Sequence, residues 1–522
     1  MIPWLVLRAK RAEGIQKEFA VIIVILFMAF LLRIWGIDYD LPYIYHPDEP
    51  GYIIISQNIF KTGDLNPHFF NYPSLFFYIN AFAYIPYYLV GKLIGIFRTP
   101  GDIVPPLSLA MGVTRAPMPS AVLLGRFITV CFGIGTVGLG YIVGKRITGR
   151  VTVGALTSLI IAISPTNVWH SRLITPDTFV TFFALTSLLG ATLIYQCGKR
   201  WHYIIAGICT GLTASTKYNG GLVIVTLLVA HFLRHRRESL KQVNLYLALF
   251  LCGISFLATT PYAVFDSTKF LNDLKFEIQH YSTGHAGMEG DSLRWYLNYM
   301  WNTAGGIYLL AVLGIFYGYA IRPHETALVS VFPLTYFLFI SRFVVRNDRT
   351  FLPVTPFLFL LSAWFLILMF DKIKNFRIRL LRQILLGFIA IFALISMAHP
   401  LLRTIEDTRH MMTVDSRETA RIWIDLHLPA GSKIAIESYA PFVDPNRFSV
   451  QGFGRMIDHE PEWYVEQGFD YLVFSEGMYG RFYRDPNRYR NEILSYNNLF
   501  SRFTLVAMFT DGGYEVRVYK VR

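Results

Sequence analysis

The chain has 522 residues, of which 53% are hydrophobic and only 16% are charged. A water-soluble protein does not stay this apolar over such a length, so the composition indicates an integral membrane protein. The formal net charge of +13 does not indicate a nucleic-acid partner here, because Lys and Arg residues of a membrane protein gather on its cytoplasmic loops.

The first apolar segment runs from Phe19 to Ile37 and is preceded by basic residues. It is longer than the apolar part of a signal peptide, and no small-residue cleavage site follows it. We therefore expect a retained membrane-spanning helix whose N-terminal end lies inside.

A long external loop is expected next, at about 38–118. It contains the sequence Tyr45-His46-Pro47-Asp48-Glu49-Pro50, and an amphipathic helix is predicted over 49–60, ended by Gly63. A second, aromatic-rich helix is predicted over 73–97. We place this helix on the membrane surface, because counting it as a span would move the later basic clusters to the outside.

With this placement, basic clusters and apolar segments alternate to give about eleven membrane-spanning helices. The later spans are expected at about 120–144, 151–169, 178–197, 201–216, 219–233, 243–264, 351–370 and 383–399, with two more that turn inside near Arg322. A second external loop is expected at about 265–293. The predicted fold class is an α-helical polytopic protein of a bacterial or archaeal plasma or inner membrane, with interfacial helices in its first external loop.

The character of the chain changes at about residue 400, where apolar segments shorten and charges become frequent. Strands are predicted at Lys433–Glu437, Tyr471–Ser475, Phe503–Phe509 and Tyr514–Tyr519, and helices at Ser416–Leu426 and Tyr489–Tyr496. We therefore expect a transmembrane domain over 1–399 and a small external α/β domain over 400–522.

Ionisable residues are costly at membrane depth and by default mark a functional site. On the predicted external side these residues are Asp48, Glu49, Asp177, Lys217, Glu277, His280, His285, Arg342, Arg346 and Arg349. Structural explanations stand beside a functional one: Asp48 and Asp177 fit helix N-caps, Lys217 fits an interfacial lysine, and the arginines fit anionic headgroups. The histidines fit an ordinary loop, and the three arginines share one face only if their segment is helical.

The presence of carboxylates and cations on one face favours a shared chemistry. A carboxylate can remove the proton of an acceptor hydroxyl, and cations can stabilise a departing phosphate. Both are required for group transfer from a lipid phosphate.

The pattern resembles the integral-membrane glycosyltransferases that use polyprenyl-phosphate sugars (the GT-C class), which include the protein O-mannosyltransferases and the lipid A aminoarabinose transferase. The matching segments are Pro47-Asp48-Glu49, Gly63-Asp64, Asp177, Thr216-Lys217-Tyr218-Asn219-Gly220, Glu277–Gly290 and Arg349-Thr350-Phe351-Leu352-Pro353. The resemblance implies that Asp48 is the catalytic base, that Asp177 helps to orient the reacting groups and that Glu49 is a further catalytic residue. It implies that Lys217 and the arginines Arg342, Arg346 and Arg349 hold the donor phosphate, and that Tyr72, Glu277, His280 and His285 belong to the substrate-binding loops.

The function implied is inverting transfer of a sugar from a polyprenyl-phosphate donor to a hydroxyl acceptor on the external face. The acceptor is a protein Ser or Thr, a glycolipid or a cell-wall glycan, and membrane lipids are the other expected partners. In one respect the chain departs from the aminoarabinose transferase, because Asn71-Tyr72 stands where that family has a Glu-Lys pair. This departure counts against a divalent metal ion and against aminoarabinose as the sugar.

Two other classes of function fit part of the sequence pattern. A transporter or flippase of lipid-linked sugars would explain many spans with intramembrane charge, but it predicts inverted repeats, which the sequence does not show. An assembly protein that works through its external tail is the third interpretation.

Overall fold

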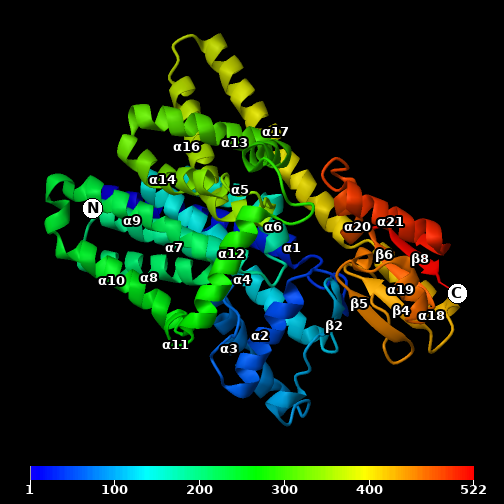
Figure 1. Cartoon of the computed structure of the whole chain (residues 1–522). Coiled ribbons are helices and arrows are strands. Elements are labelled where there is room, and N and C mark those ends of the chain that lie inside the picture. Colours follow the sequence, from blue (N-terminus) through cyan, green and yellow to red (C-terminus); the bar gives the residue numbers. More distant parts are fainter. Residues whose placement is uncertain (1, 522) are drawn as a thin grey trace.

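The computed structural model describes residues 2–521, with side chains described from residue 16 onward. A bundle of helices is joined to a small mixed domain at its side, and α17 runs from the bundle to that domain (Figure 1). The predicted fold class, a helical membrane protein with a C-terminal α/β domain, is confirmed.

Each predicted span coincides with a helix of the bundle. These helices are α1 (Ile2–Ile34), α4 (Pro119–Thr148), α5 (Val151–Ile163), α7 (Pro176–Gln196), α8 (Arg200–Thr216), α9 (Ile224–His235), α10 (Val243–Thr259), α13 (Ser292–Ile321), α14 (Pro323–Ile340), α16 (Thr355–Lys374) and α17 (Arg379–Met411). Proline begins α4, α7 and α14, where its missing N–H costs no hydrogen bond. Gly149 ends α4 with a φ of 72°.

Length and apolar composition single out fewer of these helices as membrane spans. Within the described residues, five helices meet both requirements, or six if α9 and α10, bent by 106°, count as one broken span. The number of eleven spans therefore stays a prediction.

Three segments differ in detail from expectation. The predicted span at 151–169 is broken at Pro165, which begins the short helix α6 (Pro165–His170). The expected loop at 265–293 contains the helix α12 (Ser267–Thr283), preceded by α11 (Tyr262–Phe265). The predicted boundary at residue 400 falls within α17, which continues to Met411.

Residues 38–118, which we name the first external loop after their predicted position, hold the predicted helices and a small sheet that the sequence did not indicate. The helices are α2 (Glu49–Thr62), ended by Gly63 with a φ of 72°, and α3 (Leu75–Leu93). The strands β1 (Tyr43–Ile44), β3 (Val113–Arg115) and β2 (Leu107–Ala110) pair antiparallel in that order. Strands of two to four residues are too short for alternation of side chains to reveal them.

The C-terminal domain is a five-stranded sheet in the order β5-β4-β6-β8-β7. Its strands are β4 (Lys433–Glu437), β5 (Ser449–Phe453), β6 (Tyr471–Ser475), β7 (Thr504–Phe509) and β8 (Val516–Lys520), and its helices are α18 (Ser416–His427), α19 (Pro461–Glu466), α20 (Glu476–Tyr483) and α21 (Arg490–Arg502). Strands β5, β4 and β6 are parallel, and β8 and β7 are antiparallel.

The C-terminal domain packs directly on the sheet of the first external loop. The N–H of Tyr439 donates a hydrogen bond of 2.7 Å to the carbonyl of Met111. At Gly452 the backbone approaches so closely that a Cβ atom would lie 2.0 Å from the carbonyl oxygen of Leu109. Val113 shares a buried apolar cluster with β4 and β6. This contact fixes the C-terminal domain beside the start of α2.

Candidate active site

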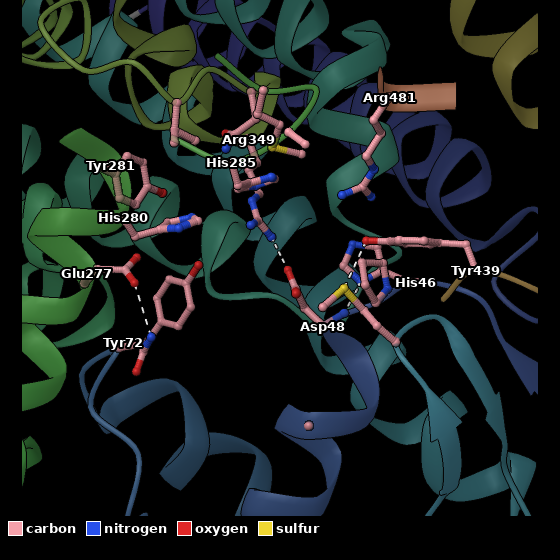
Figure 2. Close-up of a pocket in the computed structure, with 18 of the residues that line it drawn as sticks. His46, Asp48, Tyr72, Glu277, His280, Tyr281, His285, Arg349, Tyr439 and Arg481 are labelled. Atoms are coloured by element: carbon pink, nitrogen blue, oxygen red, sulfur yellow. Dashed lines mark hydrogen bonds and ion pairs between the residues drawn. The ribbon is translucent and has the colours of Figure 1, made fainter. Parts of the chain in front are cut away.

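A cavity of about 850 Å³ lies where the bundle, the first external loop and the C-terminal domain meet. We call it the inner chamber. Figure 2 shows Tyr72, Glu277 and His280 on one side of it and His46 and Tyr439 on the other, with the Asp48–Arg349 ion pair between them.

Asp48 occupies the N-cap position of α2 without a capping hydrogen bond, and its side chain pairs directly with Arg349. An Nη1–H of Arg349, which lies in the short helix α15 (Asp348–Phe351), donates to the Asp48 carboxylate, whose side chain is still 31% exposed. Burial by itself raises the pKa of Asp48, but the positive charge of Arg349 outweighs it and brings the pKa below its usual value. Asp48 is therefore ionised at neutral pH.

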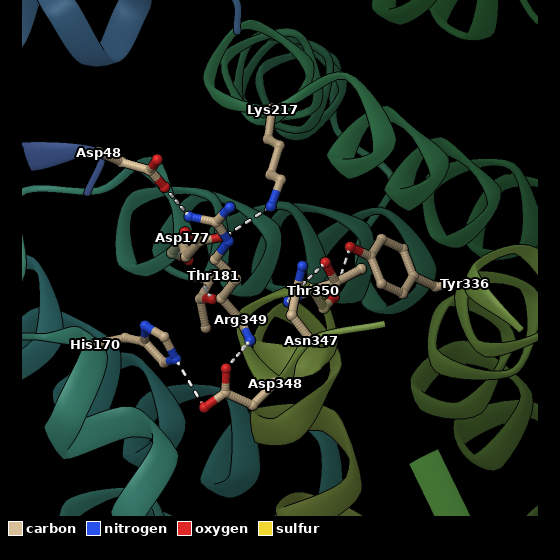
Figure 3. Close-up of polar contacts among 10 residues, drawn as sticks. All are labelled: Asp48, His170, Asp177, Thr181, Lys217, Tyr336, Asn347, Asp348, Arg349 and Thr350. Carbon is tan, nitrogen blue, oxygen red and sulfur yellow. Dashed lines mark hydrogen bonds and ion pairs between the residues drawn. The ribbon is translucent and has the colours of Figure 1, made fainter. Parts of the chain in front are cut away.

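Behind this pair lies a second, fully buried ion pair. Lys217 follows the end of α8, and its Nζ donates a 2.7 Å hydrogen bond to Asp177 in the first turn of α7. Figure 3 shows the two ion pairs next to each other, with Lys217 and Arg349 pointing toward the same region. Lys217 also lies 5.8 Å from the ring centroid of Tyr72. The structure thus brings together four of the predicted site residues, Asp48, Asp177, Lys217 and Arg349.

The turn that carries Arg349 is held by hydrogen bonds that the sequence analysis did not foresee. Oδ1 of Asn347 accepts from the N–H of Thr350 at 2.9 Å and from its hydroxyl at 2.6 Å, and Tyr336 donates to the Thr350 carbonyl at 2.9 Å. Asp348 pairs with His170 at 3.3 Å. An Asn three residues before a Thr is a helix-cap pattern, and it was the available sequence signal.

Helix α12 forms the wall opposite Asp48. Glu277 accepts a 3.3 Å hydrogen bond from the Asn71 side chain, and burial raises the pKa of Glu277. The rings of His280 and His285 stack with their centroids 5.0 Å apart, and burial lowers both of their pKa values. At neutral pH these imidazoles are uncharged and can accept or donate hydrogen bonds to a polar substrate.

Two groups of predicted site residues lie elsewhere. Glu49 is completely buried beneath the chamber, where its carboxylate receives hydrogen bonds of 3.2 and 2.9 Å from Arg126. Residues 341–347 are not helical, so the three arginines do not share a face. Arg349 lines the chamber, whereas Arg342 is exposed away from it and the Arg346 guanidinium packs against Gly290.

The C-terminal domain contributes residues that the sequence analysis missed. Tyr439 lines the chamber from the end of β4, and Arg481 reaches it from α20 with its guanidinium 4.6 Å from the Tyr439 ring centroid. Nothing local in the sequence marks these residues, because only the docking of the two domains brings them to Asp48.

A smaller apolar pocket of about 110 Å³ adjoins the chamber on the α12 side. It shares Asn71, Tyr72, Glu277 and Tyr281 with the chamber, and Lys217 lies at its wall. Its apolar lining is Leu274, Ile278, Phe339, Ile340 and Phe343. An apolar slot that ends at a cation suits a lipid with an anionic head.

A metal ion would need a cluster of ligands. Within the residues that the structure describes, no group of three or more His, Cys, Asp or Glu side chains is arranged to hold one. The three chamber carboxylates are engaged with separate partners, Asp48 with Arg349, Glu277 with Asn71 and Asp348 with His170. We therefore derive no step through a metal.

Comparison with known proteins shows which fold this arrangement of helices belongs to. Residues 116–272 match the family model of dolichyl-phosphate-mannose-protein mannosyltransferase. ArnT from Cupriavidus metallidurans, solved with undecaprenyl phosphate, aligns with a TM-score of 0.55 and 16% identity over 97% of this chain and 98% of its own. The chain has the GT-C fold. The resemblance to membrane glycosyltransferases predicted from the sequence is thereby confirmed.

A second GT-C structure is similar over most of the chain. The oligosaccharyltransferase AglB from Archaeoglobus fulgidus, in complex with an inhibitory peptide and a dolichol-phosphate, aligns with a TM-score of 0.56 and 13% identity. The alignment covers 96% of this chain and 74% of AglB. Comparison with curated protein sequences finds no match.

Proposed function

We propose that this GT-C protein transfers a sugar from a polyprenyl-phosphate donor to an acceptor hydroxyl, on the external face of the membrane and with inversion. The observation that carries the proposal is the meeting of an ionised carboxylate, Asp48, with Arg349 and Lys217 between a large chamber and a smaller apolar slot. This arrangement provides separate places for an acceptor, a phosphate and a lipid chain.

The donor fits the side of the site that holds Lys217. Its phosphate is bound by Lys217 and Arg349, and the first part of its prenyl chain enters the slot lined by Phe339 and Phe343. ArnT was solved with undecaprenyl phosphate and AglB with a dolichol-phosphate, which supports a lipid phosphate as the ligand class. Asp177 is a positioning residue that holds the Lys217 ammonium toward the phosphate.

The reaction follows from the position of the base. Asp48 accepts the proton of the acceptor hydroxyl, the hydroxyl oxygen bonds to the anomeric carbon, and the bond from that carbon to the phosphate oxygen breaks. Polyprenyl phosphate leaves with the bonding electron pair, and Lys217 and Arg349 stabilise its added negative charge. Attack on the face opposite the phosphate inverts the anomeric centre.

Arg349 has a second task in this scheme. In the ligand-free protein the Arg349 guanidinium neutralises Asp48, as Lys217 neutralises Asp177. Because each carboxylate is paired with a cation, the two can lie close together without strong repulsion. A donor phosphate competes for the guanidinium, and Asp48 is then free to accept a proton. The base becomes available when the donor is in place, which disfavours reaction with water beforehand.

The test is the Asp48→Asn variant of the full chain in lipid nanodiscs, assayed for release of polyprenyl phosphate with a panel of synthetic polyprenyl-phosphate sugars. The amide keeps the shape of the side chain but cannot take the proton, so turnover should fall by roughly 10²–10⁴-fold. Asp64→Asn, at an exposed position in the same external loop, is the matched control and should retain turnover. Near-normal turnover of Asp48→Asn would refute the assignment of the base.

A further inference from the structure

A second cavity, of about 640 Å³, lies between the start of the first external loop, the end of α17 and the C-terminal domain. We call it the outer chamber. The residues that line both chambers are His46, Pro47, Trp169, Leu173 and Tyr439. Because the chambers share these walls, the outer chamber adjoins the inner one, and it shares no lining residue with the lipid slot.

The lining of the outer chamber combines aromatic rings with ionisable side chains. The rings belong to Tyr39, Tyr45, Trp169, Tyr439 and Tyr514, and the ionisable groups to Asp40, His410, Asp415 and Arg417. Arg417 is held in a fixed position: it donates to Asp415 at 2.7 and 2.6 Å, and its guanidinium lies 3.8 Å from the Tyr45 ring centroid. The lining is therefore rigid before any ligand arrives.

Asp40 and Tyr45 are polar residues of this lining whose side chains make no hydrogen bond within the described part of the chain. The Asp40 carboxylate accepts none, although it lies beside Asp415 in a partly buried position. Its backbone has a φ of 61°, and that of Tyr439, on the opposite wall, has a φ of 67°. Non-glycine residues in this left-handed region are strained and concentrate at binding sites.

These features identify the kind of molecule that the chamber suits. A sugar ring has faces of C–H groups, which pack on aromatic rings, and a rim of hydroxyls, which donate to carboxylates and accept from guanidinium groups. A peptide that binds by strand addition is instead held mainly through its backbone amides, which pair with a strand edge. Cavities of roughly 300–1,000 Å³ hold small ligands, so the chamber accommodates a few sugar rings.

We propose that the outer chamber is the acceptor subsite and that the acceptor is a carbohydrate, whose terminal hydroxyl passes Tyr439 and His46 to reach Asp48. This inference rests on the proposed glycosyltransferase function and narrows its acceptor from any hydroxyl compound to a glycan or the glycan part of a glycolipid. The C-terminal domain then has a specific task, because it supplies Tyr439 and Tyr514 to the chamber.

Binding is measured without any donor, so that the acceptor subsite is tested separately from catalysis. The full chain in nanodiscs is titrated with hexose and pentose trisaccharides and with a short Ser/Thr-rich peptide, and binding is followed by saturation-transfer NMR. We expect at least one trisaccharide to bind and the peptide not to compete with it. Asp48→Asn should keep this binding while losing transfer, which distinguishes failure of the subsite from failure of the proposed chemistry.

Two variants locate the binding. Asp40→Asn should weaken it about tenfold or more, because a charge-assisted hydrogen bond to a sugar hydroxyl is lost. It should not lower the unfolding temperature, because the repulsion between Asp40 and Asp415 is removed. Thr413→Trp, at the exposed mouth of the chamber, should abolish binding by filling it, whereas Thr504→Trp, exposed on the same domain but outside the chamber, should not.

The proposal is overturned if no trisaccharide binds, or if the peptide binds to the wild-type chain and fails to bind to Thr413→Trp. It is also overturned if neither Asp40→Asn nor Thr413→Trp changes saccharide binding. Saccharide binding that falls in Thr504→Trp as much as in Thr413→Trp would also overturn it, because the chamber would not be the site.

Discussion

The buried pair formed by Glu49 and Arg126 makes a sharp prediction about which of two adjacent carboxylates does chemistry. Both side chains are completely buried, and the Arg126 guanidinium donates to both oxygens of Glu49. Glu49 also accepts a 2.9 Å hydrogen bond from the N–H of Ile174, and Arg126 donates to the carbonyls of Ile37 and Tyr39. The pair therefore joins the end of α1, the start of α2, α4 and the turn before α7.

The cost of breaking the pair can be estimated from these contacts. Removal of one partner of a buried ion pair costs about 3–5 kcal/mol, because the other charge is left uncompensated. The loss of stability in Glu49→Gln should be about 3 kcal/mol, at the lower end of that range. The amide keeps one oxygen acceptor, and Arg126 keeps its hydrogen bonds to two carbonyls. The loss of stability in Arg126→Gln should be about 5 kcal/mol, at the upper end of that range, because Glu49 keeps only its hydrogen bond from the Ile174 N–H.

The assay is thermal unfolding of the purified chain in detergent, together with the turnover of the fraction that remains folded. Glu49→Gln should lower the unfolding temperature by about 3 °C, because a chain of this size has an unfolding entropy of roughly 1 kcal/mol per degree, and the double variant with Arg126→Gln should cost less than the sum of the two. Turnover per folded molecule should fall far less than in Asp48→Asn. If Glu49→Gln unfolds at the wild-type temperature and loses turnover, Glu49 acts in the chemistry and our structural assignment fails.

Three further predictions concern the donor, the C-terminal domain and the orientation in the membrane. Arg349→Lys should raise the KM for the polyprenyl-phosphate donor about tenfold or more, because an ammonium cannot grip two phosphate oxygens as a guanidinium does, and Arg342→Lys should leave it unchanged. Burial raises the pKa of Glu437 to about 7, above its usual 4.5, so its contribution to stability is complete below pH 4.5 and lost as the pH rises through 7; thermal unfolding from about pH 5 to 8 should show a fall that Glu437→Gln removes. In a background without the native cysteines, Asp64→Cys should react with an impermeant thiol reagent from outside and Arg237→Cys should not; the reverse pattern would overturn the predicted orientation.

Local patterns in the sequence were sufficient for most elements. Helix α2 begins at Glu49 and ends at Gly63 because an acidic first turn and a left-handed glycine are local signals. Strands β4 and β6 have the predicted bounds, since each is an apolar run between turn residues. Strand β5 was missed because most of it is exposed and it contains Gly452, which weakens the strand pattern.

Local patterns could not determine which charges meet. Asp48 and Arg349 are separated by 301 positions, and Lys217 and Asp177 by 40. The distribution of charge among the loops predicts that all four residues lie on the same side of the membrane. This prediction does not say which of the residues on that side are in contact. It does not distinguish Arg349, in the chamber, from Arg342, which is exposed.

The C-terminal domain shows why the remaining part of the site was beyond reach. Tyr439 reaches the chambers only because β4 ends beside the sheet of the first external loop. The N–H of Tyr439 bonds to Met111, and Gly452 of the adjacent strand β5 packs against Leu109. These contacts depend on close approach of two backbones, which leaves almost no trace in side-chain character. A domain that looks like an appendage in the sequence therefore forms part of the wall beside Asp48, and the proposed acceptor subsite depends on that wall as much as on the bundle.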